Sequence, residues 1–219
     1  MDLALLVLRF VVGSFFIGHG AQKLWGHFGG HGLEGTGQFF ESLGIRPGRQ
    51  NAQIAGTAEF LGGILLIFGL FTPVAAMLII AVMTTAILTV HGKNGPWVTQ
   101  QGYEYNAVLM ATAFVLAANP GDWSLDAALG LGAIHGTAFA VLALLFGVAG
   151  GFSPVLKSRR EAEAHATAEE PIVPKQAPEA PERDDRFERD REPAQPATEA
   201  TLVIGEADTI RRRAPDDLS

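Results

Sequence analysis

Five apolar stretches, separated by polar or glycine-rich connections, fill the first 152 residues of the chain. They cover residues 3–25, 54–71, 74–91, 103–118 and 133–152. At 1.5 Å per residue, each is about long enough to cross roughly 30 Å of bilayer hydrocarbon. A backbone in lipid must satisfy its own hydrogen bonds, so the pattern predicts helices. Because the fourth stretch is short and the fifth is rich in glycine, we expect an all-α membrane protein with a bundle of four to five transmembrane helices.

The pattern changes from Ser153 onward, where the chain becomes polar. This segment carries 27 of the 39 charged residues and eight of the 12 prolines. Such a composition cannot bury enough apolar surface to offset the entropy that is lost on ordering. We therefore predict two parts, a transmembrane helical bundle at residues 1–152 and a disordered, charged, proline-rich tail at residues 153–219.

Charge and cysteine content exclude several classes of function. The net charge of −7 comes mostly from the predicted tail, and the apolar part has no basic face, so we expect no nucleic-acid binding. The chain has no cysteine. This excludes a disulfide framework, a thiolate metal site, covalent c-type haem attachment and dithiol redox chemistry by this chain alone.

Basic residues collect on one side of the predicted bundle. With five crossings, the first connection, the third connection and the tail share one side. That side carries Lys23, Arg46, Arg49, Lys93, Lys157, Arg159 and Arg160. The opposite side has no lysine or arginine, so the positive-inside rule predicts a cytoplasmic tail. If one stretch does not cross, the tail changes sides.

Glycine recurs within the predicted helices, at Gly13 and Gly20 in the first and at Gly56, Gly62, Gly63 and Gly69 in the second. Small residues let helix backbones approach closely in lipid. We interpret these positions as packing contacts.

Polar residues from four predicted helices are expected at similar depths on the basic side of the bundle. An ionisable side chain within such a helix is costly, and by default it marks a functional site. The residues concerned are His19, Lys23, Glu59, His91, Glu104 and Asn106.

Glu59 is the most informative of these residues, because apolar residues flank it on both sides. A carboxylate there must find a cation or a donor, or take up a proton. Lys23 and His19 are its natural partners by depth. Two interpretations stay open: a buried ion pair that fixes helix packing, and a site that binds a polar headgroup or relays a proton.

The first helix is expected to turn one polar face inward. At 100° per residue, Lys23 lies within about 40° of Arg9 and His19 within about 80°. Because an arginine that faces lipid would be costly, we expect Arg9, His19 and Lys23 to point into the bundle together.

The remaining histidines give weaker signals. His27 and His31 have metal-like spacing, but they lie in a glycine-rich loop, and we expect no metal site. His19 and His91 could ligate a haem between helices, but two histidines at one depth are a weak signal for a haem site. His135 begins the last helix on the opposite side and has no evident partner.

Several short motifs occur in a characteristic order along residues 3–130. The first helix contains Leu8-Arg9 and then Gly18-His19-Gly20-Ala-Gln-Lys23-Leu24-Trp-Gly26, and the first connection contains Phe39-Phe40 and Leu43-Gly44-Ile45. The second helix contains Glu59-Phe-Leu-Gly62-Gly63 and Leu66-Ile-Phe-Gly69-Leu-Phe-Thr72, and a later loop contains Gly121-Asp-Trp-Ser124-Leu125-Asp126. In this order the motifs resemble the DoxX family of small bacterial membrane proteins.

The resemblance implies a four-helix bundle and a redox-associated protein of the bacterial plasma (inner) membrane. Some relatives are the small subunit of a thiosulfate:quinone oxidoreductase, and others are linked to quinone or thiol stress. A mycobacterial relative is described as the membrane part of a complex with a sulfurtransferase and a superoxide dismutase. The stretch at residues 133–152 and the long charged tail depart from the family pattern.

Our leading hypothesis is an integral membrane subunit of a quinone or thiol/sulfur redox system. Glu59 and His19 would handle protons, and Lys23 or Arg9 would supply charge. The candidate catalytic residues are Glu59, His19 and Lys23. The candidates for substrate binding are Arg9, His91, Glu104, Asn106 and Asp126.

Under this hypothesis the expected ligand is a quinone. The expected partners are the lipid bilayer, soluble redox proteins that the tail recruits, and further copies of the chain. The alternatives are a non-catalytic anchor that holds the tail at the membrane and, ranked last, a small-molecule transporter.

Overall fold

The computed structural model describes the backbone of residues 1–168 and the side chains of residues 1–164. Within that range every regular element is helical. The longer helices are α1 (Asp2–Trp25), α2 (Gly32–Ser42), α3 (Gly48–Phe68), α4 (Thr72–Ala86), α5 (Glu104–Ala118) and α7 (Thr137–Ala168). The short elements are η1 (His27–Gly29), η2 (Ile87–His91), η3 (Gly92–Asn94), η4 (Val98–Gln100), α6 (Leu125–Ala128) and η5 (Gly132–Ile134).

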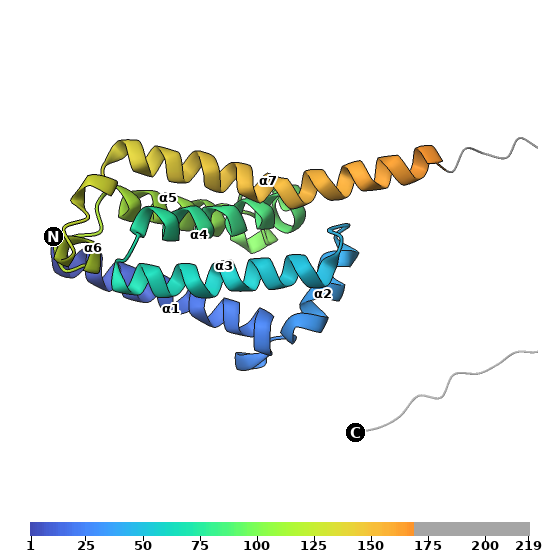
Figure 1. Ribbon diagram of the computed structural model, residues 1–219. Coiled ribbons are helices and arrows are strands. Elements are labelled where there is room, and N and C mark those ends of the chain that lie inside the picture. The colour runs from blue at the N-terminus through green and yellow to red at the C-terminus, as the bar shows by residue number, and fades with distance from the viewer. Residues whose placement is uncertain (169–219) are drawn as a thin grey trace, which may run out of the picture. The chain divides into compact units, whose positions relative to one another are not determined.

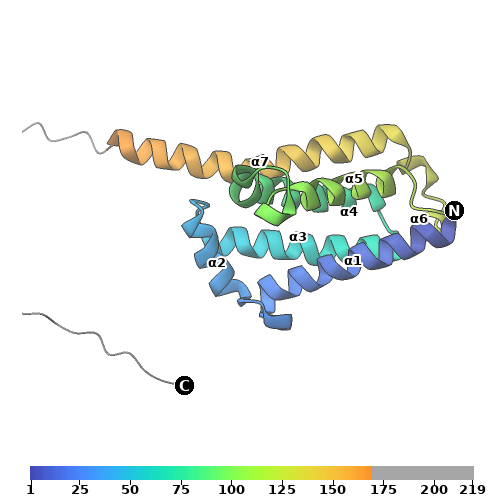
Figure 2. The ribbon, with the colours of Figure 1, turned by 180° about the vertical axis from the view of Figure 1, so that it is seen from behind.

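Four of the helical segments in residues 1–164 are long and apolar enough to cross a bilayer. They are Asp2–Trp25, Gly48–Phe68, Thr72–Asn94 and Thr137–Ala164. The shorter α5 has 15 residues, so it is about 22 Å long. It nevertheless lies alongside α4 and α7 and returns the chain to the end of the bundle at which α7 begins (Figures 1 and 2). The prediction of an all-α membrane bundle with four to five crossings is confirmed.

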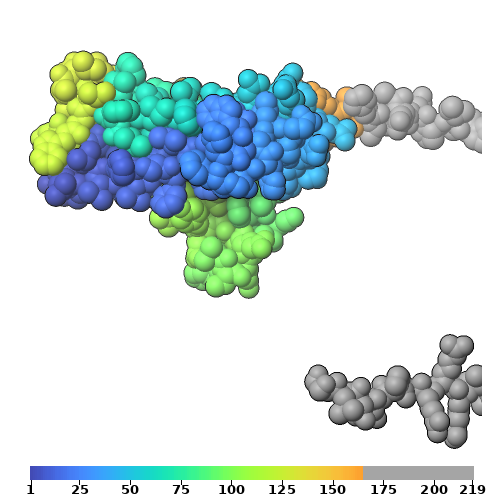
Figure 3. All heavy atoms as spheres, turned by 90° about the horizontal axis from the view of Figure 1, so that it is seen from below, coloured from blue at the N-terminus to red at the C-terminus, as the bar shows by residue number. Residues whose placement is uncertain are grey.

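The helices pack in two layers. Helices α1 and α3 lie side by side and carry α2 at one end, while α4 packs between α5 and α7 in the other layer (Figure 1). Contacts between α3 and α4 join the layers, and the core there contains Leu66, Ile79, Ile80 and Leu116, each fully buried. The connection between η2 and α5 projects from the bundle surface (Figure 3).

Glycines bring α1 and α3 into backbone contact. A Cβ atom on Gly63 would lie 2.6 Å from the carbonyl oxygen of Gly13, and one on Gly20 would lie 2.7 Å from the carbonyl oxygen of Gly56. Real Cβ atoms essentially never approach other atoms so closely, so the interface requires glycine at both positions. These positions are the packing contacts expected from the sequence.

The boundary predicted at residue 152 is not the end of a helix, because α7 continues to Ala168. Strong helix formers such as Leu156, Lys157 and Glu161 follow the apolar stretch, and Lys157 Nζ lies 3.9 Å from Glu161 Oε1, one turn further on. A change from apolar to charged residues moves a helix out of lipid without ending it. The rest of the segment predicted to be disordered, residues 169–219, lies outside the described residues.

Candidate functional site

An ion pair between α1 and α3 forms the first candidate site. Lys23 Nζ lies 2.8 Å from Glu59 Oε1 and 2.6 Å from Glu59 Oε2. The Glu59 side chain is 3% exposed and that of Lys23 is 24% exposed. The close approach of the two helices at Gly20 and Gly56 brings the last turn of α1 against this part of α3. The Glu59 side chain is therefore enclosed, whereas the Lys23 side chain is partly exposed.

His19 lies beside this pair, but not on the inward face predicted for it. It is exposed, whereas Arg9 is fully buried, and its Nδ1 lies 3.0 Å from Gln22 Oε1. The Nε2 of Gln22 in turn donates to the carbonyl oxygen of Phe28 at 3.1 Å. The angle of about 80° from Arg9 is wide enough to turn His19 out of the interface. His19 is still close enough to Glu59 for a positive charge on its ring to interact with the carboxylate.

The other polar residues expected at this depth lie in the second layer with partners of their own. His91 Nδ1 lies 2.8 Å from the carbonyl oxygen of Gln101, and Glu104 Oε1 accepts from the backbone N–H of Val98 at 2.8 Å. The Nδ2 of Asn106, which is buried, donates to Met83 Sδ at 3.4 Å. The six residues therefore do not form the single polar cluster that the sequence suggests. Connectivity brings them to one end of the bundle, but in residues 1–164 no hydrogen bond or ion pair joins His91, Glu104 or Asn106 to Lys23 or Glu59.

A second buried charged site lies near the N-terminal end of the bundle, around Asp126 of α6. Asp126 is fully buried, and its Oδ1 accepts from the backbone N–H of Phe71 at 2.8 Å. Its Oδ2 accepts from the backbone N–H of Thr72 at 2.9 Å and from Thr72 Oγ1 at 2.7 Å. His135 Nε2 lies 3.2 Å from the same oxygen, although it is not aligned for a hydrogen bond. The carboxylate thus binds the α3–α4 turn to the segment before α7.

Arg9 reaches the same site from α1. Its Nη2 donates to the carbonyl oxygen of Trp123, while within residues 1–164 its Nε and Nη1 have no hydrogen-bond partner. The guanidinium group fills the space where a Cβ on Gly69 would lie, so this turn needs glycine. The charge of Asp126 acts on Arg9, yet no ion pair within 4.0 Å joins the two in the described range.

The sequence did not predict this site as a unit. Arg9 was assigned to the same face as Lys23, although the 14 residues between them correspond to about 21 Å along a helix. In the sequence, only the family motif indicates Asp126. No pattern indicates Thr72, and His135 has no evident partner. Connectivity offered one usable signal, because the N-terminal half of α1, the α3–α4 turn and the loop around α6 must meet at one end.

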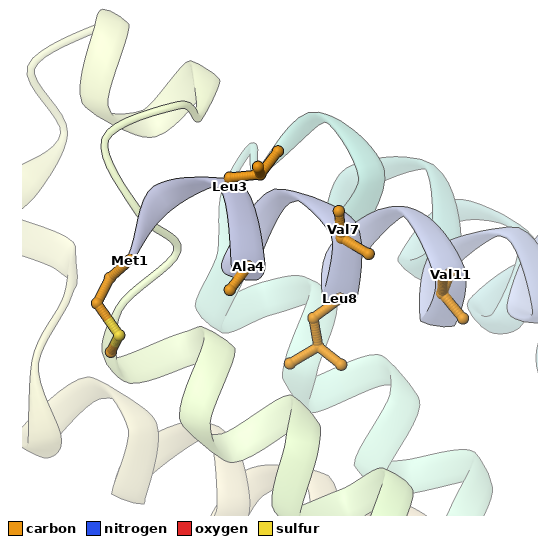
Figure 4. Close-up of a pocket in the computed structure, with 6 residues that line it drawn as sticks. All are labelled: Met1, Leu3, Ala4, Val7, Leu8 and Val11. Atoms are coloured by element: carbon orange, nitrogen blue, oxygen red, sulfur yellow. The ribbon is translucent and has the colours of Figure 1, made fainter.

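Neither charged site opens into the cavity beside the start of α1. That cavity is an apolar groove of about 650 Å³ along the first turns of α1, lined by Met1, Leu3, Ala4, Val7, Leu8 and Val11 (Figure 4). Its lining side chains include no polar group that could hold a headgroup. Among the described residues no group of three or more histidine, aspartate or glutamate side chains is placed to hold a metal ion.

Comparison with known proteins identifies relatives of this chain. The DoxX family model matches residues 4–92, which include Arg9, Lys23, Glu59 and Thr72. A Bacillus subtilis (strain 168) protein named "Putative oxidoreductase CatD" is 34% identical over 116 residues, which are 53% of this chain and 78% of that protein. An "Uncharacterized membrane protein Rv3486" of Mycobacterium tuberculosis is 30% identical over 134 residues, or 56% of this chain and 79% of that protein.

No solved structure matches the chain. The family match lies within the bundle of apolar helices, and one of the two relatives is itself named a membrane protein. This chain belongs to the DoxX family and is a membrane protein.

Proposed function

We propose that the protein is a membrane subunit of a redox system, and that Lys23, Glu59 and His19 bind the polar headgroup of a quinone. The name of the Bacillus subtilis relative supports redox chemistry. One observation carries the assignment to this site: within a transmembrane bundle, the Lys23 side chain is 24% exposed while its partner Glu59 is 3% exposed. A cation of this kind can donate to an approaching carbonyl oxygen without leaving its carboxylate.

The proposed chemistry divides between this chain and its partners. Reduction of a quinone to a quinol takes two electrons and two protons. Since the chain has no cysteine, the electrons come from a soluble partner or from a sulfur substrate. When two thiols are oxidised to a disulfide, they release the two electrons and two protons that the quinone requires. Lys23 would bind the quinone oxygen, and His19 and Glu59 would pass the protons.

Trp25 provides a fluorescent reporter for this proposal. Its ring packs edge-on against Phe60, the neighbour of Glu59, with the centroids 5.0 Å apart. In a protein with Trp97→Phe and Trp123→Phe, only Trp25 emits from indole, and a quinone bound nearby should quench it. We expect saturable quenching by a short-chain quinone, weakened at least about tenfold by Lys23→Met, because hydrogen bonds to charged groups contribute about 1.5–3 kcal/mol.

Arg49→Met is the matched control, because Arg49 lies at the same end in an exposed pair with Glu34. It should leave the quenching curve unchanged. Quenching that does not saturate, or that is equal in the Lys23→Met and Arg49→Met proteins, would contradict quinone binding at this site.

A non-catalytic anchor is the second candidate function. The observation in its favour is that Lys23 already occupies both carboxylate oxygens of Glu59, as expected of a pair that holds helices together. The two functions can be separated in a strain that lacks the gene. The chain with Glu59→Gln, His19→Gln and Lys23→Met would restore resistance to quinone or thiol stress if it acts only as an anchor, and would fail to do so if the site is catalytic.

We also propose that the protein lies in the bacterial inner membrane with its C-terminal segment in the cytoplasm. Five passes between the ends of the bundle and the basic residues beside α2 and at the end of α7 support this orientation. A cytoplasm-active reporter fused after Ser219 should be active and a periplasm-active reporter silent. The reverse result would contradict the orientation.

A further inference from the structure

A second cavity, of about 280 Å³, lies between three segments at the Lys23 end of the bundle. The α2–α3 connection contributes Leu43 and Ile45, η2 contributes Leu88, and α7 contributes Val155, Ser158 and Arg159. This volume is slightly below that of pockets for drug-sized molecules, so it fits a headgroup-sized moiety.

A hydrogen bond links two of the segments that surround the cavity. The Ser158 hydroxyl oxygen accepts from the backbone N–H of Arg46 at 2.9 Å and lies 3.4 Å from the Arg46 carbonyl oxygen. Ser158 is buried although it lies six residues after Phe152, the end of the predicted fifth stretch. The bond ties α7 to the α2–α3 connection, and Arg159, which is exposed, lines the cavity one residue further along α7.

The lining of the cavity combines an apolar floor with a cationic rim. Leu43, Ile45, Leu88 and Val155 form the apolar part, no acidic residue lines the cavity, and Arg159 lines it from α7. Leu88 and Val155 belong to candidate membrane spans, and Arg159 lies close to the end of its span. The cavity therefore lies where hydrocarbon gives way to headgroups, and basic pockets between helices at this level bind anionic lipid headgroups.

We propose that this cavity binds an anionic glycerophospholipid. The phosphate contacts Arg159, and the start of one acyl chain lies against Leu88 and Val155. The proposal is independent of quinone binding, because none of Lys23, Glu59 and His19 lines this cavity.

Native mass spectrometry of the full chain, released from micelles doped with phosphatidylglycerol or phosphatidylcholine, tests the proposal. We expect preferential retention of one phosphatidylglycerol. Arg159→Gln should weaken its retention by about fivefold, the effect of removing one basic residue near an anionic lipid. Arg160→Gln is the matched control, because Arg160 is adjacent and exposed but does not line the cavity.

A second variant tests the apolar part. Ala162 lines the cavity, and Ala162→Trp should fill it and reduce retention while all the basic residues remain. Equal loss in Arg159→Gln and Arg160→Gln would show general attraction to a basic surface and overturn the site. Equal retention of phosphatidylcholine, or displacement of the lipid by millimolar inorganic phosphate, would overturn the assignment of its occupant.

Discussion

The two buried charged sites of this bundle are built in different ways. Lys23 and Glu59 form a direct pair between two helices, and the Lys23 side chain is partly exposed. Asp126 and Arg9 are both fully buried, and each is held mainly by backbone groups of other segments. The first site involves two helices, whereas the second joins α1, the α3–α4 turn, α6 and the segment before α7.

This difference separates a site that can meet a ligand from one that closes the fold. Asp126 has three donors within 2.9 Å and no exposed surface, so a substrate could reach it only after the loop around α6 moved away. Lys23 needs no such movement. We therefore assign binding to the Lys23 end and stabilisation to the Asp126 end, and no longer propose that Arg9 and Asp126 contact a substrate.

The largest effect is expected at the closed site. Asp126→Ala removes the acceptor for the backbone N–H groups of Phe71 and Thr72 and the negative charge near Arg9. Breaking a buried charged network by removing one partner costs about 3–5 kcal/mol, so the free energy of unfolding should fall by about that amount. Denaturant unfolding in detergent measures it. The exposed neighbour variant Asp122→Ala should change it by less than about 0.5 kcal/mol, and equal effects would contradict the comparison.

Gly69 tests whether Arg9 is fixed in its place. Its φ is +59°, and the space for its Cβ is taken by Arg9 and Ser124, so Gly69→Ala combines backbone strain with overpacking, together about 2–4 kcal/mol. Gly44 has a φ of +80° and open space around its Cβ position, so Gly44→Ala should cost only about 1–2 kcal/mol. Equal losses in thermal unfolding would show that Arg9 moves aside freely.

A smaller effect is expected at the open pair. In Glu59→Gln the Lys23 ammonium group can turn toward water, so we expect a loss of about 1–2 kcal/mol, below the range for a fully enclosed pair. Adding Lys23→Met should recover most of that stability, because two neutral residues often replace a buried pair at little cost. The double variant should still fail to bind quinone. If Glu59→Gln lowered the free energy of unfolding as much as Asp126→Ala, the Lys23–Glu59 pair would be as important for stability as the Asp126 site, and the comparison would fail.

The smallest effect sets the baseline for an exposed charge pair. Arg49 Nε lies 3.7 Å from Glu34 Oε2, with side chains 68% and 76% exposed. Water and salt screen such pairs, so Glu34→Gln should change the free energy of unfolding by less than about 0.5 kcal/mol. A loss comparable to that of Glu59→Gln would mean that enclosure of Glu59 adds nothing.

Much of the fold followed from sequence patterns whose physical cause is local. Apolar stretches of membrane length determined the helices, and the glycines within them indicated close packing of helix backbones, although not which helices are partners. The depth of Lys23 and Glu59 also follows from counting residues, because the rise of a helix is constant. Their pairing could therefore be expected before the structure was known.

The tertiary structure decided which helices are neighbours, and with them the sites. Six polar residues share one end of the bundle, but only the layering shows that His91, Glu104 and Asn106 lie apart from Glu59. Likewise Asp126 meets Thr72 across 54 residues of sequence. Periodicity and depth describe one helix at a time, whereas a contact between segments depends on how all the side chains pack together, and no single stretch contains that information.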